Sequence, residues 1–239
     1  MTIELSPTRR NPPITRWLYG LFRILPLSPS RKLALALDMD WVLYHLSHDY
    51  SRRVFPFNEH PKRVATIAFL KKYISPDNKV LDLGCGSGGL THVLASMARS
   101  TTGVDLIQEQ VHRAAQAITN PRLNFIVADL VDYAMSYDST VDVVTLSHVV
   151  GELEDPVSLF LRLNEITSTV FIEVDDFESN KLNHYRMLLP HTTLFTDSSG
   201  RRMYDRDGLV QEIEEGGLII EEEECRHGVL RYWCQTQST

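Results

Sequence analysis

The sequence predicts an α/β fold in which a largely parallel β-sheet is covered by helices on both faces. Three observations predict it. Short apolar segments alternate with helical segments over residues 79–175, a glycine-rich turn follows the first strand, and two further strands close the chain. Alternating strands and helices are typical of a parallel sheet, because each helix returns the chain to the start of the next strand. The 239 residues suffice for one such domain with an extension.

The expected strands are short and apolar, and the helices between them each carry one apolar face. The strands are expected at residues 79–83, 101–106, 123–130, 141–147, 169–175, 218–224 and 228–234. Helices are expected at residues 88–98, 109–118, 156–166 and 205–217. A short turn joins the last two strands, which predicts a hairpin at the end of the chain.

A helical extension is expected before the first strand. Ser28 and Pro29 suit the N-cap and first turn of a helix, and apolar residues then recur every three or four positions over 33–44. Asn58 is the expected cap of a second helix that reaches about Tyr73.

The extension and the main domain differ in composition. We predict an N-terminal basic segment and helical cap at residues 1–57 and the main domain at residues 58–239. Residues 1–32 carry a net charge of +5, which leaves −12 on the rest of a chain whose net charge is −7. Nucleic-acid binding needs clustered lysine and arginine, so the acidic body argues against a nucleic-acid partner.

The basic segment at residues 9–32 also contains tryptophan, tyrosine and leucine. Such a segment suits peripheral contact with an anionic membrane, but packing on the main domain and a dimer contact are equally open. No run of about 20 apolar residues predicts a membrane span. The three cysteines form neither a disulfide framework nor a zinc pattern, so we expect reduced thiols, no metal and a cytoplasmic protein, with any membrane contact at the inner face.

The turn after the first strand, GCGSGG at residues 84–89, allows two cofactor interpretations. Gly84, Gly86 and Gly89 match the G-x-G-x-x-G loop of dinucleotide-binding proteins. Gly84, Gly86 and Gly88 match the G-x-G-x-G loop that holds S-adenosylmethionine. The first would move a hydride and the second a methyl group.

Other features favour the methyl donor. Asp82 precedes the loop and would face the ammonium group of the methionine moiety, whereas a pyrophosphate would be repelled there. Asp129 ends the third strand, where a carboxylate can accept a hydrogen bond from the adenine amino group. The terminal hairpin is not needed by a dinucleotide-binding domain. Asp105, at the end of the second strand, suits ribose hydroxyls in either case.

Four segments then carry a resemblance. VLDLGCGSG, GVDL, FIVADL and VDVVTLSHVV, in this order and spacing, resemble the class I S-adenosylmethionine-dependent methyltransferases of the small-molecule type. The resemblance covers about residues 60–234. It implies a Rossmann-like seven-stranded sheet whose last strand is antiparallel, here with a helical N-terminal extension, and S-adenosyl-L-methionine as the cofactor.

The resemblance also implies which residues contact the cofactor. The glycines would shape the loop around the methionine end, and the acidic residues would bind the ammonium, ribose and adenine groups. The expected cofactor-binding residues are Asp82, Gly84, Cys85, Gly86, Gly88, Asp105, Leu106, Asp129, Leu130 and Ser147.

The fourth strand leads into the segment that would meet the methyl acceptor. Many small-molecule members of the family carry Glu-His near the end of this segment, and here the pair is Gly151-Glu152. His148 lies four residues before Glu152, so one helical turn would place both side chains on the same face. The functional interpretation is that His148 is a general base oriented by Glu152. The alternative is that His148 packs against the cofactor and Glu152 is solvated.

Residues 183–195 follow the fifth strand in an irregular segment, where long loops often shape substrate pockets. His184, Tyr185 and His191 are the expected substrate contacts, and a surface helix with ordinary histidines is the alternative.

The expected function is S-adenosylmethionine-dependent methyl transfer to a small molecule or to a glycan or lipid intermediate. The alternatives are a protein or RNA methyltransferase and a non-catalytic S-adenosylmethionine-binding module. The acceptor itself, the atom that is methylated and the oligomeric state do not follow from the residues.

Overall fold

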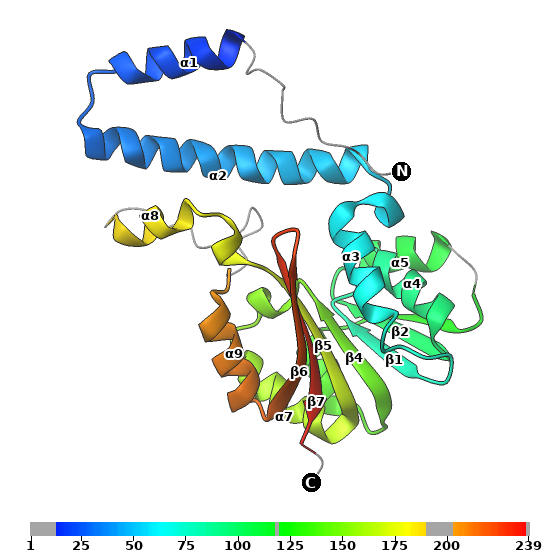
Figure 1. Ribbon diagram of the computed structural model, residues 1–239. Helices are drawn as coiled ribbons and strands as arrows, with labels where there is room; N and C mark the ends of the chain where they lie inside the picture. Colours follow the sequence, from blue (N-terminus) through cyan, green and yellow to red (C-terminus); the bar gives the residue numbers. More distant parts are fainter. Residues whose placement is uncertain (1–12, 118–119, 190–202, 238–239) are drawn as a thin grey trace.

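The protein is seen here in a computed structural model that describes residues 13–117, 120–189 and 203–237. The described strands form one seven-stranded sheet in the order β3-β2-β1-β4-β5-β7-β6 (Figure 1). They are β1 (Lys79–Leu83), β2 (Ser100–Asp105), β3 (Leu123–Val127), β4 (Val141–Ser147), β5 (Thr167–Asp175), β6 (Leu218–Arg226) and β7 (Val229–Thr236). Strands β1 to β5 are parallel, and β7 runs antiparallel to both β5 and β6. The predicted α/β sheet with an antiparallel last strand is therefore confirmed.

Helices cover both faces of the sheet. On one face lie α3 (Pro61–Leu70), α4 (Gly89–Met97) and α5 (Gln108–Ala117), and on the other lie α6 (Leu130–Ser136), α7 (Pro156–Ile166) and α9 (Arg206–Glu215). Side chains alternate across the strands, so Val80 packs into the core under α3 and α4 while Leu81 packs into the core on the opposite face. Both faces of the central strands are buried, as a parallel sheet requires.

The N-terminal part forms two helices outside the sheet, α1 (Pro13–Ile24) and α2 (Pro29–Val54). Ser28 caps α2 as predicted, and its hydroxyl accepts a hydrogen bond from the backbone N–H of Arg31. Helix α8 (Asn183–Leu188) is hydrogen-bonded to α2, because the buried guanidinium of Arg186 donates to the carbonyl of Leu37 and to Asp40.

Three short 3₁₀ helices connect the larger elements: η1 (Phe57–Glu59), η2 (Val150–Glu152) and η3 (Phe177–Ser179). The predicted cap at Asn58 is wrong, because Asn58 lies within η1 and α3 begins after His60. Pro61 explains the start, since proline suits the first turn of a helix. The predicted boundary between residues 57 and 58 also falls inside η1, and this division into two units stays a prediction.

Helix α6 was not expected from the sequence. Asp129 begins it, with Oδ1 accepting the backbone N–H groups of Val131 and Asp132. Seven residues are too few to show a helical period, so only the cap could have signalled this element. Among the described residues, no helix is both long enough and apolar enough to span a bilayer.

Candidate functional site

A cavity of about 690 Å³ opens at the carboxyl ends of the parallel strands. The loops after β1 to β4 form one wall, and α2, η1 and the start of α3 form the other. This is the edge at which open parallel sheets bind their ligands. The expected site residues that line the cavity are Asp82, Gly84, Cys85, Gly86, Asp105, Leu106, Asp129, Leu130, Ser147, His148 and Glu152.

The glycine loop takes a backbone path that other residues rarely adopt. Gly84, Gly86 and Gly88 have φ angles of 77°, 53° and 76°. A Cβ on Gly84 would overlap the side chain of Val149, so the loop packs too closely for any side chain there. Gly88 does not line the cavity but starts α4, whose first turn receives no side-chain cap from the described residues. The amides of this turn therefore suit an anionic group of a ligand.

Asp105 ties the glycine loop to the end of β2. Its Oδ2 accepts the backbone N–H of Gly86 at 2.8 Å, and its Oδ1 accepts that of Ile107 at 2.9 Å. Each carboxylate oxygen can accept a further hydrogen bond, so Asp105 retains acceptor capacity toward the cavity. Asp129 likewise lines the cavity while capping α6. Both are placed as expected, and their contacts with a cofactor stay predictions.

Asp82 is placed differently from its expected role. The side chain is buried, and its oxygens accept hydrogen bonds from Thr91 at 2.7 Å and Thr145 at 2.6 Å. Burial raises the pKa of Asp82 despite these two hydrogen bonds. The carboxylate thus joins β1 to α4 and β4, and direct contact with an ammonium group stays a prediction.

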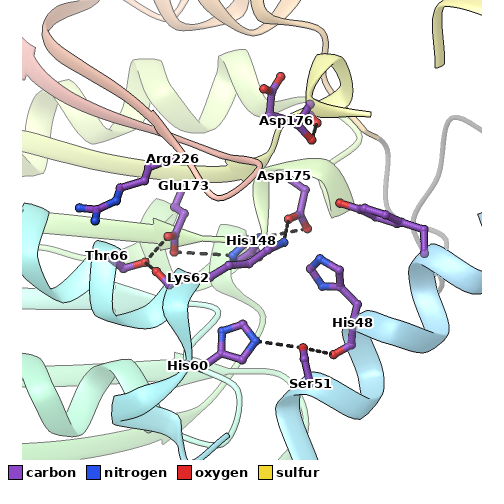
Figure 2. Close-up of polar contacts among 12 residues, drawn as sticks. His48, Ser51, His60, Lys62, Thr66, His148, Glu173, Asp175, Asp176 and Arg226 are labelled. Atoms are coloured by element: carbon purple, nitrogen blue, oxygen red, sulfur yellow. Dashed lines mark hydrogen bonds and ion pairs between the residues drawn. The ribbon is translucent and has the colours of Figure 1, made fainter. Parts of the chain in front are cut away.

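His148 follows β4 and is oriented by carboxylates other than the expected one. Nε2 lies 3.7 Å from Glu173 Oε2, and Nδ1 lies 3.5 Å from Asp175 Oδ2 (Figure 2). The two acids that pair with the ring come from the end of β5, while Glu152 lines the same cavity from η2, and its orientation of His148 stays a prediction. The 3₁₀ turn and a φ of 58° at His148 aim the ring toward β5 rather than along a helical face.

Glu173 is the centre of a buried polar network behind His148. Its carboxylate accepts hydrogen bonds from Ser147 at 2.6 Å and from Thr66, and it pairs with Arg231 at 3.1 Å. Glu173 and Arg231 are both fully buried. Burial alone would raise the pKa of Glu173, but the charges of His148, Arg63 and Arg231 outweigh it and hold this pKa below its ordinary value.

Asp175 lines the cavity, unlike Glu173, and contacts two basic side chains. Lys62 Nζ donates to Oδ1 at 2.7 Å, while Oδ2 faces His148. Burial opposes ionisation, but His148 and Lys62 lower the pKa of Asp175 well below its usual range. Sequence reasoning missed Lys62, Glu173 and Asp175. The available signal was the pair of acids at alternate positions ending an apolar strand, which places both on one face.

The expected substrate contacts are not brought to the cavity. His184 and Tyr185 lie exposed on α8 and do not line it, while the buried side of α8 packs Asn183 and Arg186 against its surroundings. The guanidinium of Arg186 faces α2 and leaves these two side chains exposed, and their contact with a substrate stays a prediction. His191 lies outside the described residues.

The second wall of the cavity is formed by the C-terminal half of α2, by η1 and by the start of α3. Its residues are His48, Arg52, Phe55, Phe57, His60, Lys62 and Arg63. Burial and the nearby charge of Lys62 lower the pKa of His48 to about 4, so its ring is neutral near pH 7. Figure 2 shows His48 on α2 facing His148 across the cavity. Within the described ranges, no three His, Cys, Asp or Glu side chains are arranged to hold a metal ion.

Solved structures share this architecture. Magnesium protoporphyrin IX methyltransferase from Synechocystis PCC 6803 superposes with a TM-score of 0.57 at 15% identity, covering 84% of this chain and 99% of that one. An S-adenosylmethionine-dependent methyltransferase from Methanosarcina mazei gives a TM-score of 0.55 at 20% identity, over 72% and 98% of the two chains. At these identities the likeness concerns the fold.

The sequence supplies the deciding match. Residues 81–168, which contain the glycine loop, Asp105, Asp129 and His148, match the family described as "Methyltransferase domain". Over these residues the chain is similar in sequence to this methyltransferase family, and its fold is the one that the solved methyltransferases share.

Curated relatives match the central part of the chain. The ubiquinone biosynthesis O-methyltransferase of Hydrogenovibrio crunogenus is 31% identical over 96 residues, which are 39% of this chain and 40% of that protein. The enzyme of the same name from Vibrio parahaemolyticus is 35% identical over 83 residues, or 34% and 35% of the two chains. The chain thus spans well under half the length of the relatives it matches.

The class I cofactor, S-adenosylmethionine, fits the site that the residues form. The left-handed conformations of Gly84 and Gly86 bring the loop backbone to the cavity, the uncapped first turn of α4 suits a carboxylate, and Asp105 offers acceptor oxygens at the end of β2.

Proposed function

We propose that the protein transfers a methyl group from S-adenosylmethionine to a small molecule or to a glycan or lipid intermediate. One observation carries the proposal: the glycine loop, Asp105, His148 and Asp175 all line a single cavity. S-adenosylmethionine, when bound, supplies a methyl group on a sulfonium centre. The chain would align the acceptor with that group, which is the main contribution of an enzyme to an in-line transfer.

His148 is the proposed general base for a hydroxyl acceptor. At 3.7 Å, Nε2 is beyond hydrogen-bond distance of Glu173, whose oxygens already accept from Ser147 and Thr66. This nitrogen is thus able to accept a proton from an acceptor hydroxyl. Asp175 faces the other nitrogen and would stabilise the positive charge that the ring then gains.

The small-molecule acceptor is supported by the curated relatives, which are named for a step of ubiquinone biosynthesis. A lipid-linked acceptor would also suit peripheral membrane contact through residues 9–32. The proposal therefore includes a cytoplasmic protein that contacts the inner face of a membrane. The basic composition of that segment supports this part of the proposal.

Calorimetric titration with S-adenosylhomocysteine tests the proposed cofactor site, with NAD as the parallel ligand. We expect micromolar binding of S-adenosylhomocysteine only, weakened at least tenfold by Asp105→Ala, since that carboxylate lies at the cavity and fixes the loop. Asp132→Ala is the matched control, because Asp132 is an exposed acid of α6 outside the cavity. Binding of NAD alone, or of neither ligand, would contradict the proposal.

Methyl transfer itself needs a second readout. The purified protein is incubated with S-adenosylmethionine labelled on its methyl group and with a cell extract. Label in the low-mass fraction supports a small-molecule acceptor, and label in protein or RNA supports the macromolecular alternative. Binding without any transfer would favour a non-catalytic module.

A further inference from the structure

Helix α1 has an apolar face that nothing in the described chain covers. Residues 14, 17, 18, 21 and 24 recur at helical spacing and form one stripe along the helix. Ile14, Trp17 and Ile24 expose 63%, 64% and 77% of their surface, and no α1 residue is buried among the described residues. Soluble proteins rarely expose such a continuous stripe unless it contacts a partner.

The other face of α1 is basic. Arg16 and Arg23 are seven residues apart, hence two turns apart, on the side opposite the stripe. Residues 13–32 contain three arginines and one lysine and no acidic residue. A short helix with an apolar face, arginines on the polar face, and tryptophan and tyrosine along its length is typical of helices that lie in a membrane interface.

We propose that α1 lies in the interface of an anionic bilayer, with the stripe of residues 14, 17, 18, 21 and 24 in the apolar layer and its arginines at the lipid phosphates. Charge decides between a bilayer and a second copy of the chain. A symmetric contact between two copies through the stripe would leave the arginines on the outer faces without an anionic partner in that contact, whereas anionic headgroups neutralise them.

The arrangement of the helices gives this contact a role. A short turn at residues 25–28 joins α1 to α2, and α1 lies on the side of α2 away from the sheet (Figure 1). The C-terminal half of α2 lines the cavity through His48 and Arg52. Docking of α1 would hold this wall near the bilayer, which suits an acceptor that is dissolved in the membrane. The inference rests on the proposed function, which includes a membrane contact, and names the helix face that makes this contact.

Co-sedimentation of the full chain with vesicles tests the inference. The vesicles are pure phosphatidylcholine or phosphatidylcholine with about one third phosphatidylglycerol, a mixture rich enough in anionic lipid to attract basic segments. We expect binding to the anionic vesicles that weakens with added salt. Replacing Arg16 and Arg23 by Gln should weaken it roughly thirtyfold, the effect of removing two cations near the surface.

A matched pair of variants tests the stripe. The double variant Trp17→Ser/Leu21→Ser keeps the net charge and should lower vesicle binding by about tenfold or more. The control Tyr19→Ser removes an aromatic residue with 68% exposure from outside the stripe and should retain most of the binding. All variants should bind S-adenosylhomocysteine as the wild type does, since α1 does not line the cavity.

Three outcomes would overturn the inference. They are absence of binding to the anionic vesicles, equal binding by the stripe variant and the wild type, and a dimer in solution that the stripe variant abolishes while vesicle binding is absent. Because S-adenosylhomocysteine binding is measured in parallel, failure of the membrane contact is distinguishable from failure of the cofactor site.

Discussion

Asp175 places its carboxylate between two basic side chains of different origin, with Oδ2 3.5 Å from Nδ1 of His148 and Oδ1 2.7 Å from Nζ of Lys62. The acid comes from the end of β5, the histidine from the loop after β4 and the lysine from the first turn of α3. This contact orients the histidine ring beside the cavity and ties the start of α3 to the end of β5.

Replacing His148 by Asn should lower kcat/KM for the acceptor by roughly 10²–10⁴-fold, the range typical of losing a general base. Affinity for S-adenosylhomocysteine should stay unchanged, since the proposed role of His148 is to take a proton from the acceptor and not to bind the cofactor. The measurement is the rate of label transfer to the acceptor found in the extract. His112→Asn is the control, because His112 is exposed on α5. Near-normal turnover would remove His148 from the mechanism.

Asp175→Asn should reduce stability in a pH-dependent way. The folded protein lowers the pKa of Asp175, so its charge stabilises the fold above the ordinary aspartate value near 4, and this contribution is lost as the pH falls. We expect the variant to unfold more easily by about 2 kcal/mol at pH 7, with the difference narrowing toward pH 3.5.

Urea unfolding of both proteins across this pH range measures the effect of Asp175. The exposed Asp77 provides the control, and Asp77→Asn should change the free energy of unfolding by less than about 0.5 kcal/mol. A constant difference at all pH values would show that the charge of Asp175 is not responsible.

The buried pair of Glu173 and Arg231 should be costly to break from one side. Arg231→Met leaves the carboxylate of Glu173 buried without its nearest cation, so we expect a loss of about 3–5 kcal/mol. The double variant Arg231→Met/Glu173→Leu should regain part of this loss, because no unpaired charge remains.

The exposed pair of Lys72 and Glu222 is the matched comparison for the buried pair. Lys72→Met should cost at most about 1 kcal/mol, since solvent screens this contact. Chemical denaturation of the three variants gives the free energies. A double variant no more stable than Arg231→Met would contradict this explanation.

Gly84→Ala should damage the glycine loop for two separable reasons. The φ of 77° costs a residue with a Cβ about 1–2 kcal/mol, and overlap with Val149 adds a packing cost of about 1–3 kcal/mol. We expect a lower melting temperature and weaker S-adenosylhomocysteine binding. Adding Val149→Ala should relieve the overlap but not the backbone strain.

Gly20→Ala is the control for the loop variant. Gly20 lies within α1, and among the described residues no atom lies within 4 Å of the added methyl group. Alanine is the better helix former, so this variant should be unchanged or slightly more stable. Equal effects of the two substitutions would contradict the importance of the loop conformation.

The strands and most helices could be predicted because their signals are local. Periodicity in the side chains marks β1 to β7 and α7, and the glycine spacing places the loop of Gly84 to Gly88 directly after β1. Helix α6 was too short to show a period, and Asn58 was misread as a cap because Pro61 had the stronger effect on where α3 begins.

The candidate site, like the fold, was predictable only where its signals are local. The cofactor end was predictable because its residues follow consecutive strand ends, and the carboxyl ends of parallel strands meet at one edge. The grouping of Lys62, His148 and Asp175 was not predictable. Lys62 and Asp175 lie more than 110 residues apart in the chain, and the three side chains meet only once α3 has packed beside β5. The exposure of His184 and Tyr185 was also not predictable from the sequence. Their position after β5 suits a substrate loop, but the packing of Arg186 against α2 turns both side chains outward.

The sequence by itself determined the α/β class, the strand order along the chain, the glycine loop and the basic amphipathic segment, because each rests on residues close together in the chain. Only the tertiary structure decided that Glu173 and Asp175 lie beside His148. Only it decided that α2 forms the second wall of the cavity, and that the apolar stripe of α1 stays uncovered by the described chain. The physical reason is that side-chain orientation and burial depend on which elements pack together, and that contact is made between residues far apart in sequence.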